Sequence, residues 1–184
     1  GPDDFGFFKD KDINFGLRRL SIIDIKEGHQ PMSTADGDIT IIFNGEIYNY
    51  KELRKDLTKK GVSFKTHSDT EILLKSYREY GLNCLQKFNG MFAFVIWDKK
   101  EEELFLVRDR YGIKPLYYSV VNNTILFGSE QRVILQHSRF SKKLDKEALY
   151  EYFTFQNILT NKTFLENVYL LDSATIAKID LKKK

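Results

Sequence analysis

The chain has 184 residues, of which 42% are hydrophobic, so it is long enough to form one compact domain with a hydrophobic core. Its 29 basic and 26 acidic residues leave a net charge of +3, which argues against nucleic acid or an anionic membrane as a partner. A single cysteine, Cys84, excludes an intrachain disulfide and indicates a cytoplasmic protein, and no apolar run approaches the ~18 residues of a membrane span.

The first predicted elements form a strand, a helix and a second strand. Residues 39–43 are short and β-branched, which is typical of a buried strand, and the Asn44–Gly45 pair should end it. Residues 51–60 carry leucines four apart on one face and precede a glycine, so they predict a helix. Residues 62–66 alternate apolar and polar, as in a strand.

The middle of the chain predicts a capped helix followed by hairpins. Ser68 to Glu71 resembles a capping segment before an apolar-periodic helix over residues 72–80. Residues 91–97 are continuously apolar, which indicates a strand buried on both faces. Further strands are predicted over residues 104–107, 116–121 and 124–127, the last two joined by Asn122–Asn123, a pair suited to positive φ.

The end of the chain predicts a helix over residues 145–153, with Leu149 and Phe153 on its buried side, and a strand over residues 175–179. Because the predicted strands come mostly as hairpins, the pattern indicates an α+β fold of antiparallel sheets with helices packed outside them.

Several kinds of site are excluded by the residues that are present. The three histidines do not accompany a cysteine or serine motif, and one cysteine with scattered histidines cannot form a zinc site, so no metal is expected in this domain. Neither a nucleophile elbow nor a phosphate-binding loop occurs. Cys84 lies between Leu82 and Leu85 without an adjacent base, and we interpret it as a buried structural thiol.

Several polar residues that could bind a substrate or take part in catalysis lie near the ends of predicted elements. Arg19 could be a surface ion pair, Asn44–Gly45 a turn, and Asp69 a helix cap. Taken together with Glu46, they suit an amino-acid substrate. A cation can hold the α-carboxylate, carboxylates can hold the α-ammonium, and an amide with a glycine N–H can form an oxyanion hole.

A series of longer motifs makes this interpretation specific. In chain order they are Arg19-Leu20-Ser21-Ile22-Ile23-Asp24, Gly28-His29-Gln30-Pro31-Met32, Phe43-Asn44-Gly45-Glu46-Ile47-Tyr48-Asn49, Ser68-Asp69-Thr70-Glu71, Gly90-Met91-Phe92-Ala93-Phe94, Arg108-Asp109-Arg110-Tyr111-Gly112-Ile113-Lys114-Pro115-Leu116-Tyr117-Tyr118 and Phe127-Gly128-Ser129-Glu130. This order resembles the glutaminase domain of glutamine-hydrolysing asparagine synthetases, which belongs to the class II glutamine amidotransferases, and it covers most of the chain.

The resemblance implies an N-terminal-nucleophile (αββα) sandwich, in which two stacked antiparallel sheets are flanked by helices. It implies glutamine as the substrate. Arg19 then corresponds to the anchor of the α-carboxylate, and Asn44 and Gly45 to the oxyanion hole. Glu46 and Asp69 correspond to the groups that recognise the α-amino end, and Leu20 and Ile22 to wall and backbone contacts of the pocket.

The chain departs from the family pattern at its beginning. Family members begin with a cysteine that is the nucleophile and whose own α-amine is the base, whereas residue 1 here is Gly1. We expect residues 1–184 to be an amidotransferase domain without its first strand and catalytic cysteine, and this polypeptide to be inactive. A piece of a longer protein is favoured over a degenerate homologue, because the binding residues are intact.

The resemblance also implies a larger protein. Residues 145–184 resemble a segment that leads towards a synthetase domain, which would bind ATP and Mg²⁺, whereas this domain needs no cofactor. Phe153, Phe155, Val168 and Leu171 could pack on that domain or close this domain's own core. A homodimer is left open. The alternatives are an amidotransferase acting on a sugar carboxylate in surface polysaccharide synthesis and a non-catalytic glutamine-binding module.

Overall fold

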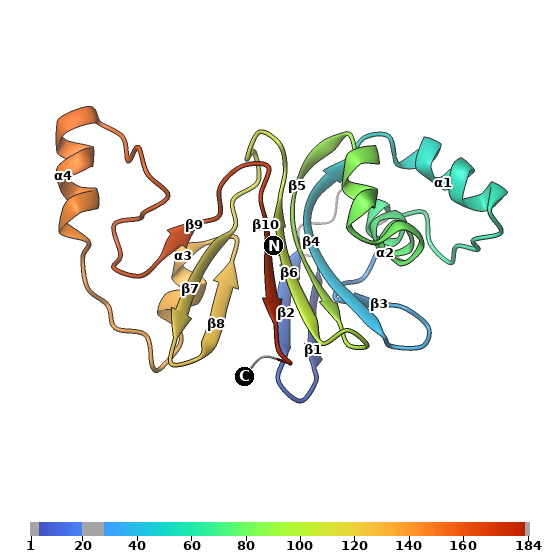
Figure 1. Cartoon of the computed structure of the whole chain (residues 1–184), viewed down its shortest axis with the longest axis horizontal. Coiled ribbons are helices and arrows are strands. Elements are labelled where there is room, and N and C mark those ends of the chain that lie inside the picture. Colours follow the sequence, from blue (N-terminus) through green and yellow to red (C-terminus); the bar gives the residue numbers. More distant parts are fainter. Residues whose placement is uncertain (1–3, 20–27, 183–184) are drawn as a thin grey trace. The chain divides into compact units, whose positions relative to one another are not determined.

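The structure, a computed structural model, describes residues 4–19 and 28–182 (Figure 1). The chain divides into two compact units. The first unit comprises residues 1–106 and 178–184, and the second comprises residues 107–177. Among the described residues, no helix has the length and apolar character that a membrane crossing requires.

The main sheet has five strands in the order β10-β6-β5-β4-β3. β3 pairs antiparallel with β4, and β4 with β5. The strands are β3 (Met32–Ser33), β4 (Ile39–Ile47), β5 (Gly90–Asp98), β6 (Glu103–Arg108) and β10 (Ile176–Asp180). The strands predicted over residues 91–97, 104–107 and 175–179 are confirmed as β5, β6 and β10.

The prediction that Asn44–Gly45 would end the first strand is wrong. β4 continues to Ile47, with Asn44 opposite Ala93 and Gly45 opposite Phe92. The long partner strand β5 pairs with all nine residues of β4, so strand pairing overrides the turn preference of an Asn-Gly pair.

Two helices follow β4 and lie beside one another on one face of the sheet (Figure 1). They are α1 (Tyr50–Lys59) and α2 (Asp69–Tyr80), and the 3₁₀ segment η1 (Gly81–Lys87) follows α2. α1 buries Leu53 and Leu57, as its spacing predicts. The core of this unit includes side chains of both helices and the sheet that are at most 1% exposed, namely Ile41, Ile47, Leu57, Ile72, Leu73, Leu74, Phe94 and Ile96.

The predicted strand over residues 62–66 does not form. Instead the carboxylate of Glu71 accepts hydrogen bonds from the Lys65 and Thr66 backbone N–H groups, at 3.0 and 2.7 Å. A side chain therefore takes the place of a neighbouring strand, and the Phe64 ring packs under Arg54 at 4.5 Å.

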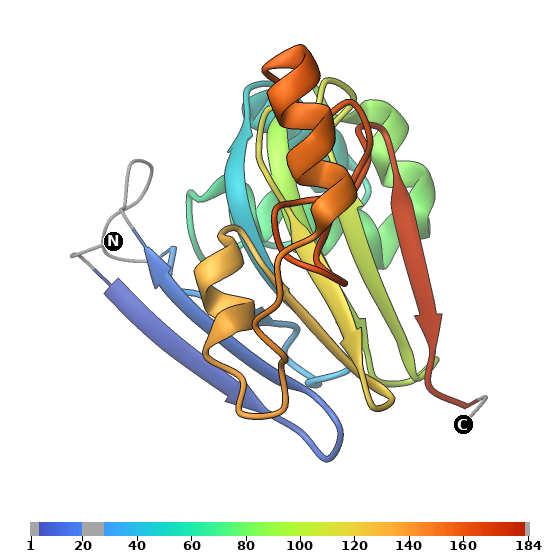
Figure 2. The same ribbon diagram turned by 90° about the vertical axis from the view of Figure 1, so that its left-hand side faces the viewer.

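A two-stranded sheet near the start of the chain was not predicted. β1 (Asp4–Lys9) and β2 (Asn14–Arg19) form an antiparallel hairpin, drawn in blue in Figure 2. Phe15 is buried and packs on Phe8 with ring centroids 5.9 Å apart. Glycines within both strands conceal the apolar alternation that would have revealed the hairpin.

The second unit holds a three-stranded sheet in the order β8-β7-β9. Its strands are β7 (Tyr117–Val121), β8 (Thr124–Gly128) and β9 (Tyr169–Leu170). The predicted hairpin is confirmed, with φ of 46° at Asn122 and 60° at Asn123. α3 (Gln131–Leu135) packs on it through a small core of Ile134, Phe140 and Val168.

α4 (Lys146–Phe155) buries a different side from the one predicted. Phe153 is 80% exposed and Leu149 is half-buried, whereas Ala148 is fully buried and Tyr152 packs edge-on against Phe164. Because successive helical residues are about 100° apart, Ala148, the buried residue of α4, points to a different side of the helix from Leu149 and Phe153.

Candidate functional site

The predicted oxyanion pair and Glu46 lie together near the end of β4. Asn44, Gly45 and Glu46 are each half-buried, whereas Phe43 and Ile47 on either side of them are buried. Because side chains alternate along a strand, Asn44 and Glu46 point to the same face of the sheet. The buried neighbours fix this partly accessible segment in the core.

Gly45 lies in unusually close contact with β5. Its φ is +147°, and a Cβ built there would be 2.1 Å from the Met91 carbonyl oxygen and 2.7 Å from the Cα of Phe92. No larger residue fits without moving the strand pair apart. Close packing therefore demands the glycine of the predicted oxyanion hole.

The N-terminus of α2 brings Asp69 to the same segment. Asp69 is 3% exposed, and its Oδ2 accepts a hydrogen bond from the Ile47 N–H at 3.1 Å. Ser68 caps the helix, since its Oγ accepts from the Glu71 N–H at 3.2 Å. The helix dipole favours a negative charge at this position. The hydrogen bond thus brings together two of the motifs in which the sequence placed predicted site residues.

Arg19 is the last residue of β2, where its backbone pairs with Asp4. Leu20 and Ile22, along with the side chain of Arg19, lie outside the described residues. Of the predicted site residues, the structure therefore brings together four, which are Asn44, Gly45, Glu46 and Asp69.

Asn49 and Glu71 support this segment, and sequence reasoning assigned neither of them a role. Asn49 donates its amide to the Lys87 carbonyl at 2.9 Å and accepts from the Asn89 N–H at 3.0 Å, which fixes the chain just after β4. Glu71 holds the loop that leads to Ser68, through Lys65 and Thr66. In the sequence, Asn49 and Glu71 were noticed only as members of two motifs, and no role in the site was inferred for either residue.

Cys84 has none of the properties of a nucleophile. It lies in η1, is 1% exposed, and burial raises the pKa of its thiol to about 12. The prediction of a buried structural thiol is confirmed. In the described part of the chain, no three His, Cys, Asp or Glu residues gather into a group that could hold a metal.

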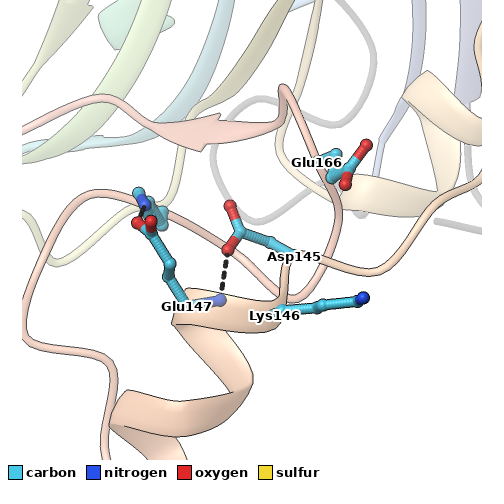
Figure 3. Close-up of a pocket in the computed structure, with 5 residues that line it drawn as sticks. Asp145, Lys146, Glu147 and Glu166 are labelled. Atoms are coloured by element: carbon cyan, nitrogen blue, oxygen red, sulfur yellow. Dashed lines mark hydrogen bonds and ion pairs between the residues drawn. The ribbon is translucent and has the colours of Figure 1, made fainter.

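A polar depression of about 300 Å³ opens at the start of α4 (Figure 3). It is lined by Asp145, Lys146, Glu147, Lys162 and Glu166. The Asp145 carboxylate caps the helix through the Glu147 N–H at 2.9 Å, and Lys162 pairs with the Glu147 carboxylate. None of the predicted site residues lines this depression, and three of its charged side chains, those of Asp145, Glu147 and Lys162, have structural partners of their own.

Solved structures share this fold. One is titled as the allosteric regulatory enzyme of purine biosynthesis, with a TM-score of 0.59 and 21% identity over 85% of this chain and 30% of that one. Another is the glutamine phosphoribosylpyrophosphate amidotransferase of B. subtilis, with a TM-score of 0.57 and 19% identity over 90% of this chain and 34% of that one. These likenesses confirm the predicted α+β fold.

Sequence comparison gives the family. The profile described as "Glutamine amidotransferase domain" matches residues 1–184, so the chain belongs to the family of glutamine amidotransferase domains. The glutamine-hydrolyzing asparagine synthetase 1 of Bacillus subtilis is 50% identical over 156 residues, which are 85% of this chain and 24% of that protein. A putative glutamine-hydrolyzing asparagine synthetase 2 of Methanocaldococcus jannaschii is 38% identical over 205 residues, covering 100% of this chain and 39% of its own. The chain thus spans well under half of the length of these relatives.

Proposed function

We propose that this domain hydrolyses glutamine to glutamate and ammonia, and that the complete protein uses the ammonia to convert aspartate to asparagine. The observation that carries the proposal is the bond between Ile47 N–H and Asp69, which holds the segment of Asn44, Gly45 and Glu46 against the start of α2. The names of the relatives supply the amide acceptor, because both are called asparagine synthetases.

The proposed chemistry needs a thiol that Cys84 cannot provide. A cysteine at the start of the complete protein would attack the side-chain carbonyl carbon of glutamine, with its own α-amine accepting the thiol proton. Collapse of the tetrahedral intermediate expels ammonia and leaves a thioester, which water then hydrolyses to glutamate. For the same reason we expect the 184-residue polypeptide to be inactive without that cysteine.

The residues of this chain would bind the substrate and stabilise the charge that develops on it. The Asn44 side-chain amide and the Gly45 N–H would donate to the oxyanion of the tetrahedral intermediate. Arg19 would hold the α-carboxylate, while Glu46 and Asp69 would receive the α-ammonium. A pocket with these contacts selects glutamine by both ends of the amino acid and by its carboxamide.

Substitutions of two residues, Asn44 and Arg19, in the complete protein test these roles. Asn44→Ala should lower kcat on the order of 10²–10³-fold with a smaller effect on KM, because an oxyanion donor acts mainly on the transition state. Arg19→Ala should raise KM for glutamine about ten-fold or more, since a charged hydrogen bond contributes about 1.5–3 kcal/mol. Arg19→Lys should restore binding only in part, because lysine lacks the bidentate fork.

The matched controls are Asn14→Ala and Arg18→Ala, which change exposed residues of the same types on β2. Steady-state ammonia release by all four alanine variants gives the comparison. A higher KM with unchanged kcat in Asn44→Ala would make this residue a ground-state contact. Equal KM values for Arg18→Ala and Arg19→Ala would remove Arg19 from the site.

A further inference from the structure

Gln30 lies in a motif to which the sequence assigned no role, and it is 2% exposed. Its side-chain Oε1 accepts a hydrogen bond from the Phe43 backbone N–H at 2.7 Å, and its Nε2 donates to the Thr70 Oγ1 at 3.2 Å. The orientation of the amide is fixed, because a backbone N–H can only donate and therefore requires the oxygen. Both the oxygen and the nitrogen of this buried amide therefore form hydrogen bonds.

The side chain of Gln30 extends the ladder between β3 and β4. Met32 pairs with Ile41 and Ser33 with Thr40, so the same register places Gln30 opposite Phe43. At that position the glutamine side chain, in place of a strand backbone, accepts the Phe43 N–H. The side chain then continues to α2, which a backbone carbonyl could not reach.

β4 is therefore tied to the start of α2 at two points. Gln30 links Phe43 to Thr70, and Asp69 links directly to Ile47. The residues between these two ties are Asn44, Gly45 and Glu46. Both ends of the candidate oxyanion segment are thus held to the helix turn that carries Asp69.

We propose that Gln30 is a positioning residue for glutamine hydrolysis. It sets the placement of Asn44 and Gly45 relative to Asp69, so that the oxyanion donors and the group that receives the α-ammonium fit one glutamine molecule. This inference rests on the proposed function. Its physical basis is that a displacement of about 1 Å in a catalytic constellation can cost about 10²-fold in rate.

The test compares ammonia release by the complete protein with Gln30 intact, Gln30→Met and Gln30→Glu. Methionine keeps an unbranched side chain but loses both hydrogen bonds, and kcat/KM should fall roughly 10- to 100-fold, chiefly through kcat. Glutamate keeps acceptors for the Phe43 N–H and the Thr70 hydroxyl and should restore most of the loss. Hydrogen exchange of the Phe43 amide should quicken in Gln30→Met and slow again in Gln30→Glu.

Thr34→Val is the matched control. Thr34 is 5% exposed and its Oγ1 accepts from the Ile39 N–H at 3.1 Å, so its loss also removes a buried bond of β4, at the end remote from Asn44. This control should lower stability and leave kcat unchanged. Equal losses of kcat in Thr34→Val and Gln30→Met would overturn the proposal, because stability alone would then explain both.

A milder variant covers the case in which Gln30→Met fails to fold. Thr70→Val removes one bond and keeps the Phe43 contact, so it should lower kcat several-fold with a smaller loss of stability than Gln30→Met. Unchanged kinetics in Thr70→Val, or in a folded Gln30→Met, would overturn the positioning role while ammonia release by the unmodified protein upholds the proposed function. Absence of ammonia from the unmodified protein would instead remove the proposed function and this inference with it.

Discussion

The backbone at Gly45 approaches β5 so closely that its environment can be understood only from strand pairing. The sequence indicated glycine as part of an Asn-Gly turn, but the residue instead continues β4 opposite Phe92. A Cβ at 2.1 Å from the Met91 carbonyl oxygen explains why glycine is required. The motif predicted the right residue, but the reason depends on a strand far along the chain, which no local pattern reveals.

The rate at which the Cys84 thiol is alkylated should depend strongly on pH. Burial raises the pKa of its thiol to about 12, so the thiol stays protonated at neutral pH, and alkylation of the native chain by iodoacetamide should be slow at pH 8. The rate should keep rising well above pH 9, since the reactive thiolate forms only as the pH approaches the raised pKa. After unfolding in urea, the rate should follow an ordinary thiol with a pKa of about 8.5.

Measuring glutamine hydrolysis by a Cys84 variant tests separately whether Cys84 is the nucleophile. Cys84→Ala in the complete protein should retain ammonia release from glutamine as long as the variant is folded. Loss of release in a variant with native circular dichroism would identify Cys84 as the nucleophile and contradict our interpretation.

Among the elements, the segment before α2 shows what a local pattern cannot predict. Residues 62–66 alternate as a strand would, yet Glu71 supplies the acceptors that a neighbouring strand normally provides. The helix itself was predictable, because Ser68 caps it and its apolar spacing is regular. The alternation of residues 62–66 did not show whether a neighbouring strand was present, and an alternating segment forms a strand only where another strand is available for pairing.

Glu71 should therefore be more important to stability than its place in a capping motif indicates. It is 4% exposed and accepts from two backbone N–H groups and from the Thr66 hydroxyl. Glu71→Ala leaves these donors without partners and should lower the free energy of unfolding by at least about 2 kcal/mol. Denaturation in urea, with fluorescence of Trp97, measures the change.

Glu79→Ala is the control for this substitution. Glu79 pairs with Lys60 at the surface at 2.9 Å, and such exposed pairs contribute about 0–1 kcal/mol. If the two variants lose the same stability, the contacts of Glu71 with the loop contribute no more than a surface ion pair.

At the scale of the whole molecule, ordered motifs predicted the family and the α+β class. The β1–β2 hairpin was missed because its strands contain glycines, and the buried residue of α4 is Ala148 where Leu149 and Phe153 were predicted. Val168, at 1% exposure, packs in the core of its own unit, and Leu171 is buried at 4% exposure, while Phe153 and Phe155 are exposed. The sequence showed that all four side chains are apolar, but only the folded structure shows which of them are buried and which are exposed.

Because Val168 is buried and Phe153 is exposed, substitutions at these two positions of the 184-residue chain should differ in how much they lower its stability. Val168 packs with Ile134 and Phe140, so Val168→Ala should lower the free energy of unfolding by about 1–3 kcal/mol. Phe153 is 80% exposed, and Phe153→Ser should change it by less than about 0.5 kcal/mol. A large loss in Phe153→Ser would mean that this ring is packed in solution.

We propose that this domain releases the amide nitrogen of glutamine and that the complete protein transfers it to aspartate. The most direct measurement supplies the complete protein with aspartate, ATP, Mg²⁺ and glutamine that carries heavy nitrogen in its side-chain amide. Mass spectrometry then follows the label. We expect glutamate together with asparagine labelled in its side-chain amide, and labelled ammonia when aspartate is omitted. Recovery of all the label in unchanged glutamine would contradict it.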